Sequence, residues 1–227
     1  MSLSGQAAVL IWHNVLGEFR ADFHEWHNRE HMPERLAIAG FRRGRRYRAI
    51  EGEPEFFNLY EADGLEILSG PEYLSRLNSP TPWTKRVLPG FRDVARSICR
   101  IVHTAGVGQG GFVLTLRFEV AADQREQTTE RLARTILPTV ALRPGIVGAH
   151  LCLTDAGASD VVTAEATVRV VPTIVPSCAV LIEGISGAHV KSAGATVADA
   201  LADTTTTAPF QAAVYYLENC QENLVSV

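Results

Sequence analysis

The chain has 227 residues, of which 46% are hydrophobic and 20% are charged, so it can bury a substantial core. Its 21 lysine and arginine residues stand against 25 aspartate and glutamate residues, and the net charge of −4 argues against nucleic acid as a partner. The sequence shows neither a signal peptide nor an apolar run long enough to span a bilayer. We therefore expect no membrane partner and a cytoplasmic location.

The first part of the chain is predicted to alternate strands and helices. Residues 9–15 form an apolar, strand-like run, and the next apolar side chains recur at helical spacing at Phe19, Phe23 and Trp26. Pro33 disturbs this helix, and Gly40 permits a turn into a strand at residues 41–50. The remaining predicted elements are a strand at 54–62, a helix at 65–77 and a strand at 94–102.

The second part of the chain repeats this order at a constant offset of 105 positions. Residues 32–47 align without a gap on residues 137–152, so that Pro33 corresponds to Pro138 and Gly40 to Gly145. The predicted elements are strands at 112–120, 146–153, 177–184 and 212–220, with helices at 123–137 and 189–201. We predict two repeats, residues 1–105 and 106–227, joined by a glycine-rich connector. An insertion near residues 154–176 is rich in valine and threonine and is predicted to form an extended β lobe.

Each repeat has the β-α-β-β-α-β order of a ferredoxin-like unit, a four-stranded antiparallel sheet with both helices on one face. The strands are apolar on both sides, so the face without helices must also be buried. We therefore predict an α+β protein whose two sheets pair face to face within one chain as a pseudo-dimeric α/β barrel. A homodimer of such barrels is compatible with this arrangement but is not required by it.

Two segments carry a family resemblance, EWHNREHMPERLAIAGFRRGRRY at residues 25–47 and SPTPWTKRVLPGF at residues 79–91. In these segments and in its topology the chain resembles the dimeric α/β-barrel superfamily, and more narrowly the EthD-like proteins in tandem form. The resemblance implies a cavity between sheet and helices that holds a small aromatic or polyketide-like substrate, or haem in some relatives. It also implies that a histidine in an H-x-P context faces the pocket, which here is His31.

The first predicted helix carries His24, His27 and His31 on one flank. A metal site usually needs three or four convergent ligands, and the helical His-Glu-x-x-His signature is absent, so we predict no metal. His24 and His27 are predicted to be solvated. His31 differs because its counterpart in the second repeat is Ile136, which indicates an inward position. An imidazole there could act as an acid or base or anchor a ligand oxygen. The alternative is a core histidine bonded to Glu34 or to a backbone carbonyl.

Four further residues are candidates for ligand binding. Strand alternation places Arg45 on the same face as Phe41 and Tyr47, where it could hold an anionic substrate from inside the barrel or pair with nearby acids. Trp83, in a proline-bracketed loop, is either a pocket lid or a packing plug. The complete set of candidates is His13, Arg45, Tyr47 and Trp83, beside the catalytic candidate His31.

No nucleotide-binding loop, Cys-His pair or spaced cysteine motif is present, so we predict no cofactor and four reduced cysteines. The leading hypothesis is a small-molecule enzyme or binder, with cofactor-independent proton transfer by His31 on an aromatic or keto-type substrate. A haem-binding barrel is the second hypothesis, with His150 or His189 as axial ligand. The third is a non-catalytic assembly or sensing module, which a barrel interior filled by side chains would favour.

Overall fold

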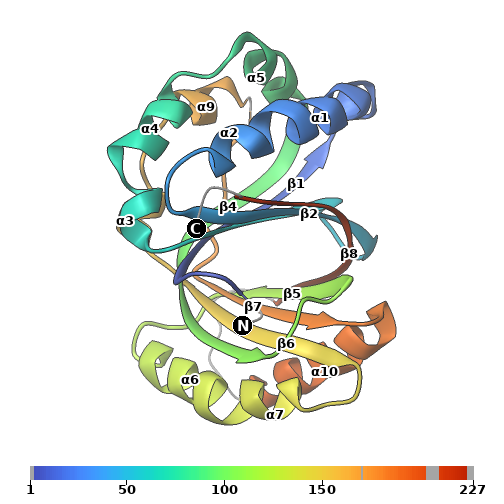
Figure 1. The fold of residues 1–227 in the computed structure, drawn as a ribbon. Coiled ribbons are helices and arrows are strands. Elements are labelled where there is room, and N and C mark those ends of the chain that lie inside the picture. The colour runs from blue at the N-terminus through green and yellow to red at the C-terminus, as the bar shows by residue number, and fades with distance from the viewer. Residues whose placement is uncertain (1–2, 170, 203–209, 224–227) are drawn as a thin grey trace.

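A computed structural model describes residues 3–169, 171–202 and 210–223. Its centre is a closed barrel of eight antiparallel strands in the order β1-β3-β2-β8-β5-β7-β6-β4, with helices on two opposite outer faces (Figure 1). This confirms the predicted α+β class and the closed barrel. The strands are β1 (Ala7–Val15), β2 (Phe41–Glu51), β3 (Phe56–Ala62), β4 (Phe91–Gly106), β5 (Phe112–Phe118), β6 (Ile146–Thr154), β7 (Cys178–Gly184) and β8 (Gln211–Glu222).

The barrel closes where the edge strands of the two halves pair with each other. Strand β2 pairs with β8 and β4 pairs with β6, so neither half retains an open edge in the barrel. The interior is filled by apolar and aromatic side chains from both halves, including Leu10, Trp12, Phe57, Leu181 and Tyr215. Within the described chain, these side chains form one hydrophobic cluster inside the barrel.

A buried charge cluster occupies one part of the barrel interior. The guanidinium of Arg45 lies 2.9 Å from Glu61 of the first half and 2.9 Å from Glu183 of the second, and all three side chains are fully buried. His150 contacts Glu183 at 3.4 Å through Nε2. Although burial acts in the opposite direction, Arg45 and His150 lower the pKa of Glu183 to about 2. Arg45 thus joins the two sheets through ion pairs.

The first helical layer follows β1 and contains a π-helical turn. Helix α1 (Arg20–Trp26) continues through the π turn His27–His31 into α2 (Met32–Leu36). In the second half, α6 (Arg125–Arg131), the π turn Leu132–Ile136 and α7 (Leu137–Ala141) follow β5 in the same way. Gly40 and Gly145 both end these segments at positive φ, 90° and 76°, as the glycine turns predicted. The first helix of each half and the π turn that follows it therefore begin and end at positions 105 residues apart.

The second helical layer differs between the halves. The helix predicted at 65–77 is broken at Gly70 and Pro71 into α3 (Leu65–Leu68) and α4 (Pro71–Asn78). The proline-bracketed segment is not a loop but contains α5 (Pro82–Val87). Thr81 caps this helix by accepting a hydrogen bond from the backbone N–H of Thr84 at 3.0 Å. A single helix, α10 (Gly187–Ala200), takes this place in the second half.

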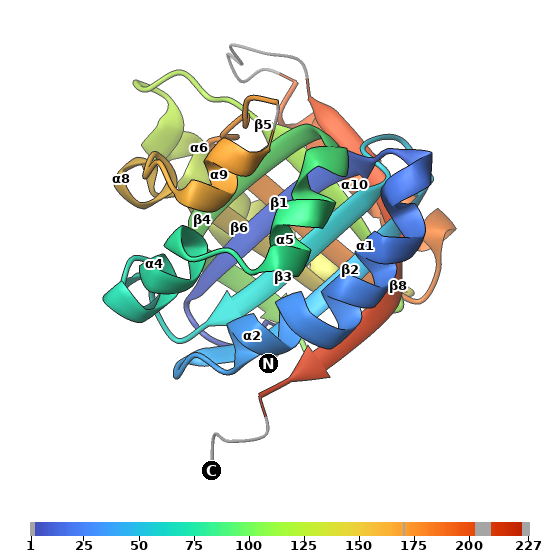
Figure 2. The same ribbon diagram turned by 90° about the horizontal axis from the view of Figure 1, so that it is seen from above.

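The insertion does not form the predicted β lobe. It contains α8 (Ala156–Ser159) and α9 (Ala164–Val168), because the side chains of Asp155 and Thr163 cap helix N-termini. The backbone N–H groups of Asp155 and Arg96 donate to Ile98 and Ile174 at 2.9 Å each, which attaches the insertion to β4. Figure 2 shows α8 and α9 beside α4 and α5, over the outer face of β4 and β1.

A β-bulge changes the predicted face of one residue in β2. The register shifts between Phe41 and Arg43, so Phe41 packs in the helix-side core while Tyr47 packs in the barrel interior. Three of the four cysteines are buried, and all four are free thiols, but Cys220 is exposed and is not a core thiol. None of the described helices is long and apolar enough to cross a membrane.

We expect Arg45→Gln to destabilise the fold by about 3–5 kcal/mol, because it removes the buried cation that Glu61 and Glu183 share. Glu61 then keeps Arg43 as its ion-pair partner, and Glu183 keeps its contact with His150. Arg42→Gln is the matched control on the same strand. The Arg42–Asp63 pair is largely exposed, and its loss should cost less than about 1 kcal/mol. Urea unfolding of both variants measures the difference, and equal midpoints would show that the buried cluster does not hold the sheets together.

Candidate functional site

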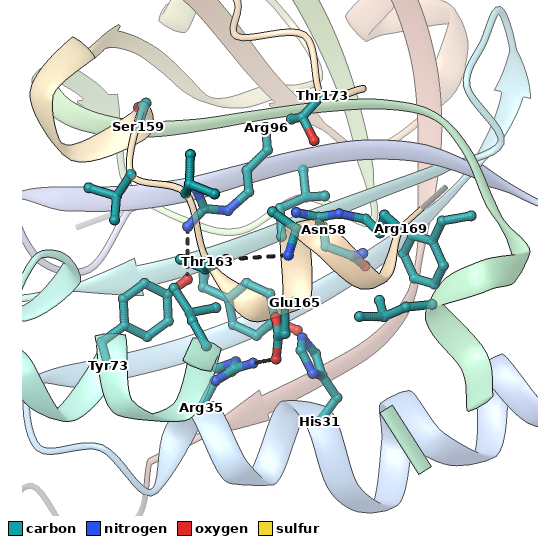
Figure 3. Close-up of a pocket in the computed structure, with 18 of the residues that line it drawn as sticks. His31, Arg35, Asn58, Tyr73, Arg96, Ser159, Thr163, Glu165, Arg169 and Thr173 are labelled. Carbon is teal, nitrogen blue, oxygen red and sulfur yellow. Dashed lines mark hydrogen bonds and ion pairs between the residues drawn. The ribbon is translucent and has the colours of Figure 1, made fainter. Parts of the chain in front are cut away.

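A cavity of about 330 Å³ lies outside the barrel, between the first sheet and the elements that cover it. The sheet contributes Ile11, Asn58, Tyr60 and Arg96 to its walls, and the helical layer contributes Trp26, His27, His31, Arg35 and Tyr73. The insertion closes the cavity with residues between Ser159 and Val175 (Figure 3). The volume is at the lower end of the range for small-molecule sites.

The equivalent space in the second half is filled. Leu132, Ile136, Val180, Ile182 and Val197 belong to one continuous aliphatic core between the second sheet and its helices. There the long helix α10 packs directly on the sheet. The shorter helices of the first half and the inserted segment leave a polar cavity in the corresponding place.

His31 is buried in the wall of this cavity, with 8% of its surface exposed. Its counterpart Ile136 is 9% exposed, so the prediction that this position faces inward is confirmed in both halves. The centroid of the imidazole ring lies 4.3 Å from that of the Trp26 ring. Its Nδ1 has no hydrogen-bond partner within the described chain. Burial, and then the charge of Arg35, lower the pKa of His31 well below 6.5, so the ring is neutral.

His27 is also buried, and the prediction that it is solvated is wrong. It follows Phe23 by four residues and therefore shares the buried face of the helix. Arg46 can only donate, so it donates to Nδ1 at 3.2 Å, and Nε2–H then donates to the Tyr60 hydroxyl at 3.0 Å. Burial and Arg46 lower the pKa of His27 well below 6.5. Both ring nitrogens are thus committed to the protein.

His13 is not among the residues that line the cavity, but it contacts Asn58, which does line it. Its ring is fully buried and stacks on Phe91 at 4.2 Å. Nδ1 contacts the Asn14 carbonyl at 3.4 Å, which makes Nε2 the acceptor for the Asn58 amide at 2.9 Å. Burial lowers the pKa of His13 to about 3. His13 therefore orients Asn58, whose Oδ1 is left without a partner.

Four residues that line the cavity have a buried polar atom without a hydrogen-bond partner in the described chain: His31 Nδ1, Arg35 Nη1, Asn58 Oδ1 and Arg169 Nε. Other such atoms lie in the barrel interior, among them the hydroxyl oxygens of Tyr47 and Tyr215. Native proteins rarely leave such atoms unpaired, and a group that does so calls for water or a ligand. The cavity thus offers a neutral imidazole, an amide oxygen and guanidinium N–H groups to an occupant.

Three arginines and two carboxylates line the cavity. Arg35 forms a buried ion pair with Glu165 of α9, which links α2 to the insertion (Figure 3). Arg96 donates to the Tyr73 hydroxyl at 3.2 Å, and Asp160 is exposed to solvent. Within the described chain no carboxylate lies within ion-pair distance of Arg96 or Arg169. Burial and the charge of Arg96 lower the pKa of Arg169 to about 10.

Three residues predicted to bind ligand lie elsewhere. Arg45 and Tyr47 point into the barrel on the opposite side of the sheet, and the Arg45 guanidinium is already paired with carboxylates. Trp83 is not part of the cavity lining that the structure describes; its indole N–H donates to Asp22 at 2.8 Å. A side chain already paired or facing the other side of the sheet cannot contribute to this site.

Sequence reasoning missed Arg35, Asn58, Arg96 and Arg169. Asn58 carried a usable signal, because it is the one amide in the otherwise apolar centre of β3, FFNLYEA. Arg96 carried a weaker signal, because β4 also contains Arg92 and Arg100. Arg169 carried none, because its position depends on where the insertion packs.

The histidines proposed for haem do not fit that role. His150 is fully buried in the barrel and uses both ring nitrogens, Nδ1 with Thr104 at 2.7 Å and Nε2 with Glu183. His189 is exposed on α10, where its Nδ1 contacts the Ser186 hydroxyl at 2.7 Å. The described residues also contain no group of three or more metal-ligating side chains.

No protein-family model and no curated protein matches this sequence. Solved structures of similar fold include an anthrone oxidase-like protein, with a TM-score of 0.64, 10% identity and coverage of 99% of this chain and 96% of the other. A candidate monooxygenase from Fusobacterium nucleatum has a TM-score of 0.58 and 8% identity, covering 97% and 96%. A candidate monooxygenase from Lactobacillus acidophilus has a TM-score of 0.53 and 10% identity, covering 96% and 97%.

These similarities over nearly the whole chain establish the fold class: the protein has the dimeric α/β-barrel fold, with both barrel halves in one chain. At such low identity they establish nothing about its reaction. The narrower resemblance to EthD-like proteins stays a prediction from the sequence.

We expect acid to destabilise the protein steeply below pH 6.5. His13, His27 and His31 stay neutral in the folded state but take up protons on unfolding, so the stability they confer is present above pH 6.5 and is lost as the pH falls. Between pH 6.5 and pH 5 each histidine should lower the free energy of unfolding by about 1.4 kcal/mol per pH unit, and the three together by about 4 kcal/mol per pH unit. Urea unfolding from pH 7 to pH 5 measures this, and His31→Ile should remove one third of it. An unchanged slope would mean that His31 titrates normally.

Proposed function

We propose that the chain is a small-molecule enzyme that performs cofactor-independent proton transfer on an aromatic or keto-type substrate in the first-half cavity. The observation that carries this proposal is the neutral, buried His31, which lines a cavity of aromatic rings and guanidinium groups and whose Nδ1 has no partner in the described chain. A histidine kept only for packing would have its nitrogens paired, as those of His27 are.

The chemistry follows from the charges around the site. A neutral Nδ1 can accept a proton from an acidic C–H beside a carbonyl, or from a phenol, which leaves an imidazolium and an enolate or phenolate. The lowered pKa of His31 keeps the base form available well below neutral pH, and the new anion beside it raises its affinity for the proton. The cavity guanidinium groups stabilise the oxyanion in a site screened from water.

The names of the similar structures are compatible with this substrate class. The anthrone oxidase-like protein is named for an aromatic ketone, and two others are named as candidate monooxygenases. Haem enters none of the proposed steps, because neither His150 nor His189 is placed to ligate iron.

A non-catalytic sensing module is the second candidate. It is supported by the barrel interior, where apolar side chains of both halves pack against one another, as predicted for such a module. The cavity outside the barrel would then bind a ligand without converting it. Ligand binding with no proton exchange at the bound carbon distinguishes this candidate from the enzyme.

His31→Ile should leave the melting temperature unchanged or slightly raised, because Nδ1 loses no bond and Ile136 fills the same position in the second half. The same variant should abolish deuterium exchange at the acidic carbon of an aromatic ketone such as anthrone, followed by NMR under anaerobic conditions. His27→Ile is the matched control. It breaks two buried hydrogen bonds and should destabilise the protein by about 1–3 kcal/mol.

Two outcomes contradict the proposal. A stable His31→Ile variant that retains exchange at the wild-type rate would remove His31 from the reaction. A variant destabilised by several kcal/mol would identify His31 as part of a buried structural network instead.

A further inference from the structure

The cavity is assembled from both halves of the chain. His31, Arg35 and Asn58 come from the first half, whereas α9 and Arg169 come from the insertion between β6 and β7 of the second. The backbone contacts of Asp155 and Ile174 with β4 hold the ends of this segment, and the Arg35–Glu165 pair holds its middle. The insertion is thus a structural wall of the site instead of an independent lobe.

Two of the three cavity arginines, Arg96 and Arg169, form no ion pair with a carboxylate of the described chain, although Glu165 partly offsets the charge of Arg169. Figure 3 shows Arg96 and Arg169 directed into the cavity, the first from the sheet and the second from the insertion. The lowered pKa of Arg169 has two causes, burial and repulsion by Arg96, and both would be relieved by an anion between the two guanidinium groups. Arg35 is different, because Glu165 already neutralises it.

We infer that the inserted segment makes the site selective for ligands with an anionic group, a carboxylate or acidic phenolate on an aromatic ring, and that Arg169 binds this group. A planar guanidinium with an unpartnered Nε presents paired N–H donors that match a carboxylate. The ring of such a ligand would meet the aromatic lining formed by Trp26, Tyr60 and Phe91. This inference rests on the proposed function for the location of the site, and it names the substrate class.

The test compares 1-hydroxy-2-naphthoate with its methyl ester, which lacks the negative charge and carries one additional methyl group, by isothermal titration calorimetry. The wild-type protein should bind the acid roughly tenfold more tightly than the ester. Arg169→Gln should weaken the acid about tenfold and leave the ester within about twofold, whereas Arg169→Lys should fall between because it keeps the charge but not the fork. Arg29→Gln, an exposed arginine paired with Glu25, is the control and should change neither.

A ligand-free measurement separates binding from folding. Arg169→Gln should keep or raise the melting temperature, since it removes a desolvated guanidinium whose pKa is lowered by burial and by Arg96 more than Glu165 raises it. Arg35→Gln should lower the melting temperature, since this substitution removes the ion-pair partner of the buried Glu165. A lower melting temperature for Arg169→Gln, equal binding of acid and ester by the wild type, or no binding of either probe would overturn the inference.

The outcome is separable from that of the proposed function. If Arg169→Gln loses the acid while His31→Ile retains proton exchange, the anion site stands and the proposed reaction fails. If His31→Ile abolishes exchange while Arg169→Gln binds both probes normally, the reaction stands and the anion site fails.

Discussion

Closure of the barrel is the constraint on which the other features depend. Each sheet has a largely apolar face without helices, and neither that face nor the sheet edges can stay in water without cost. Pairing β2 with β8 and β4 with β6 within one chain buries both of these faces and removes the edges. Apolar side chains therefore pack inside the barrel, and the cavity with His31 lies on an outer, helix-covered face. The charge cluster of Arg45, Glu61 and Glu183 fixes how the two sheets meet.

The two outer faces share a backbone and differ in what fills them. The π turn, the proline that follows it and the positive-φ glycine occur in both halves at the same offset. In the second half a long helix and aliphatic side chains complete a dry core around Ile136. In the first half three short helices cover the sheet less completely, and polar side chains occupy the inner surface. A duplicated framework therefore supports a packed core on one side and a cavity on the other.

The cavity keeps its polar groups unpaired at a cost that the rest of the fold must offset. His31 and Asn58 each leave an atom without a partner, whereas the neighbouring His27 and His13 are engaged by hydrogen bonds. The paired histidines hold the walls in place, and the unpaired groups are free to meet an occupant. The insertion adds one cation, Arg169, and the carboxylate that pairs with Arg35, and it covers the cavity, which strengthens the electrostatic contacts inside.

The α+β class, the barrel and the inward position of His31 could be predicted from the sequence. These depend on local signals, namely strand alternation, the Pro and Gly positions and the comparison of His31 with Ile136. Which polar residues meet depends on the tertiary structure. The sequence left open whether Arg45 binds a ligand or pairs with acids, and its actual partners, Glu61 and Glu183, come from two different strands. Arg169 reaches the site only because the insertion forms capped helices and is attached to β4. Pairing of charges and packing of an insertion are long-range contacts, and the local pattern of a single sequence does not encode them.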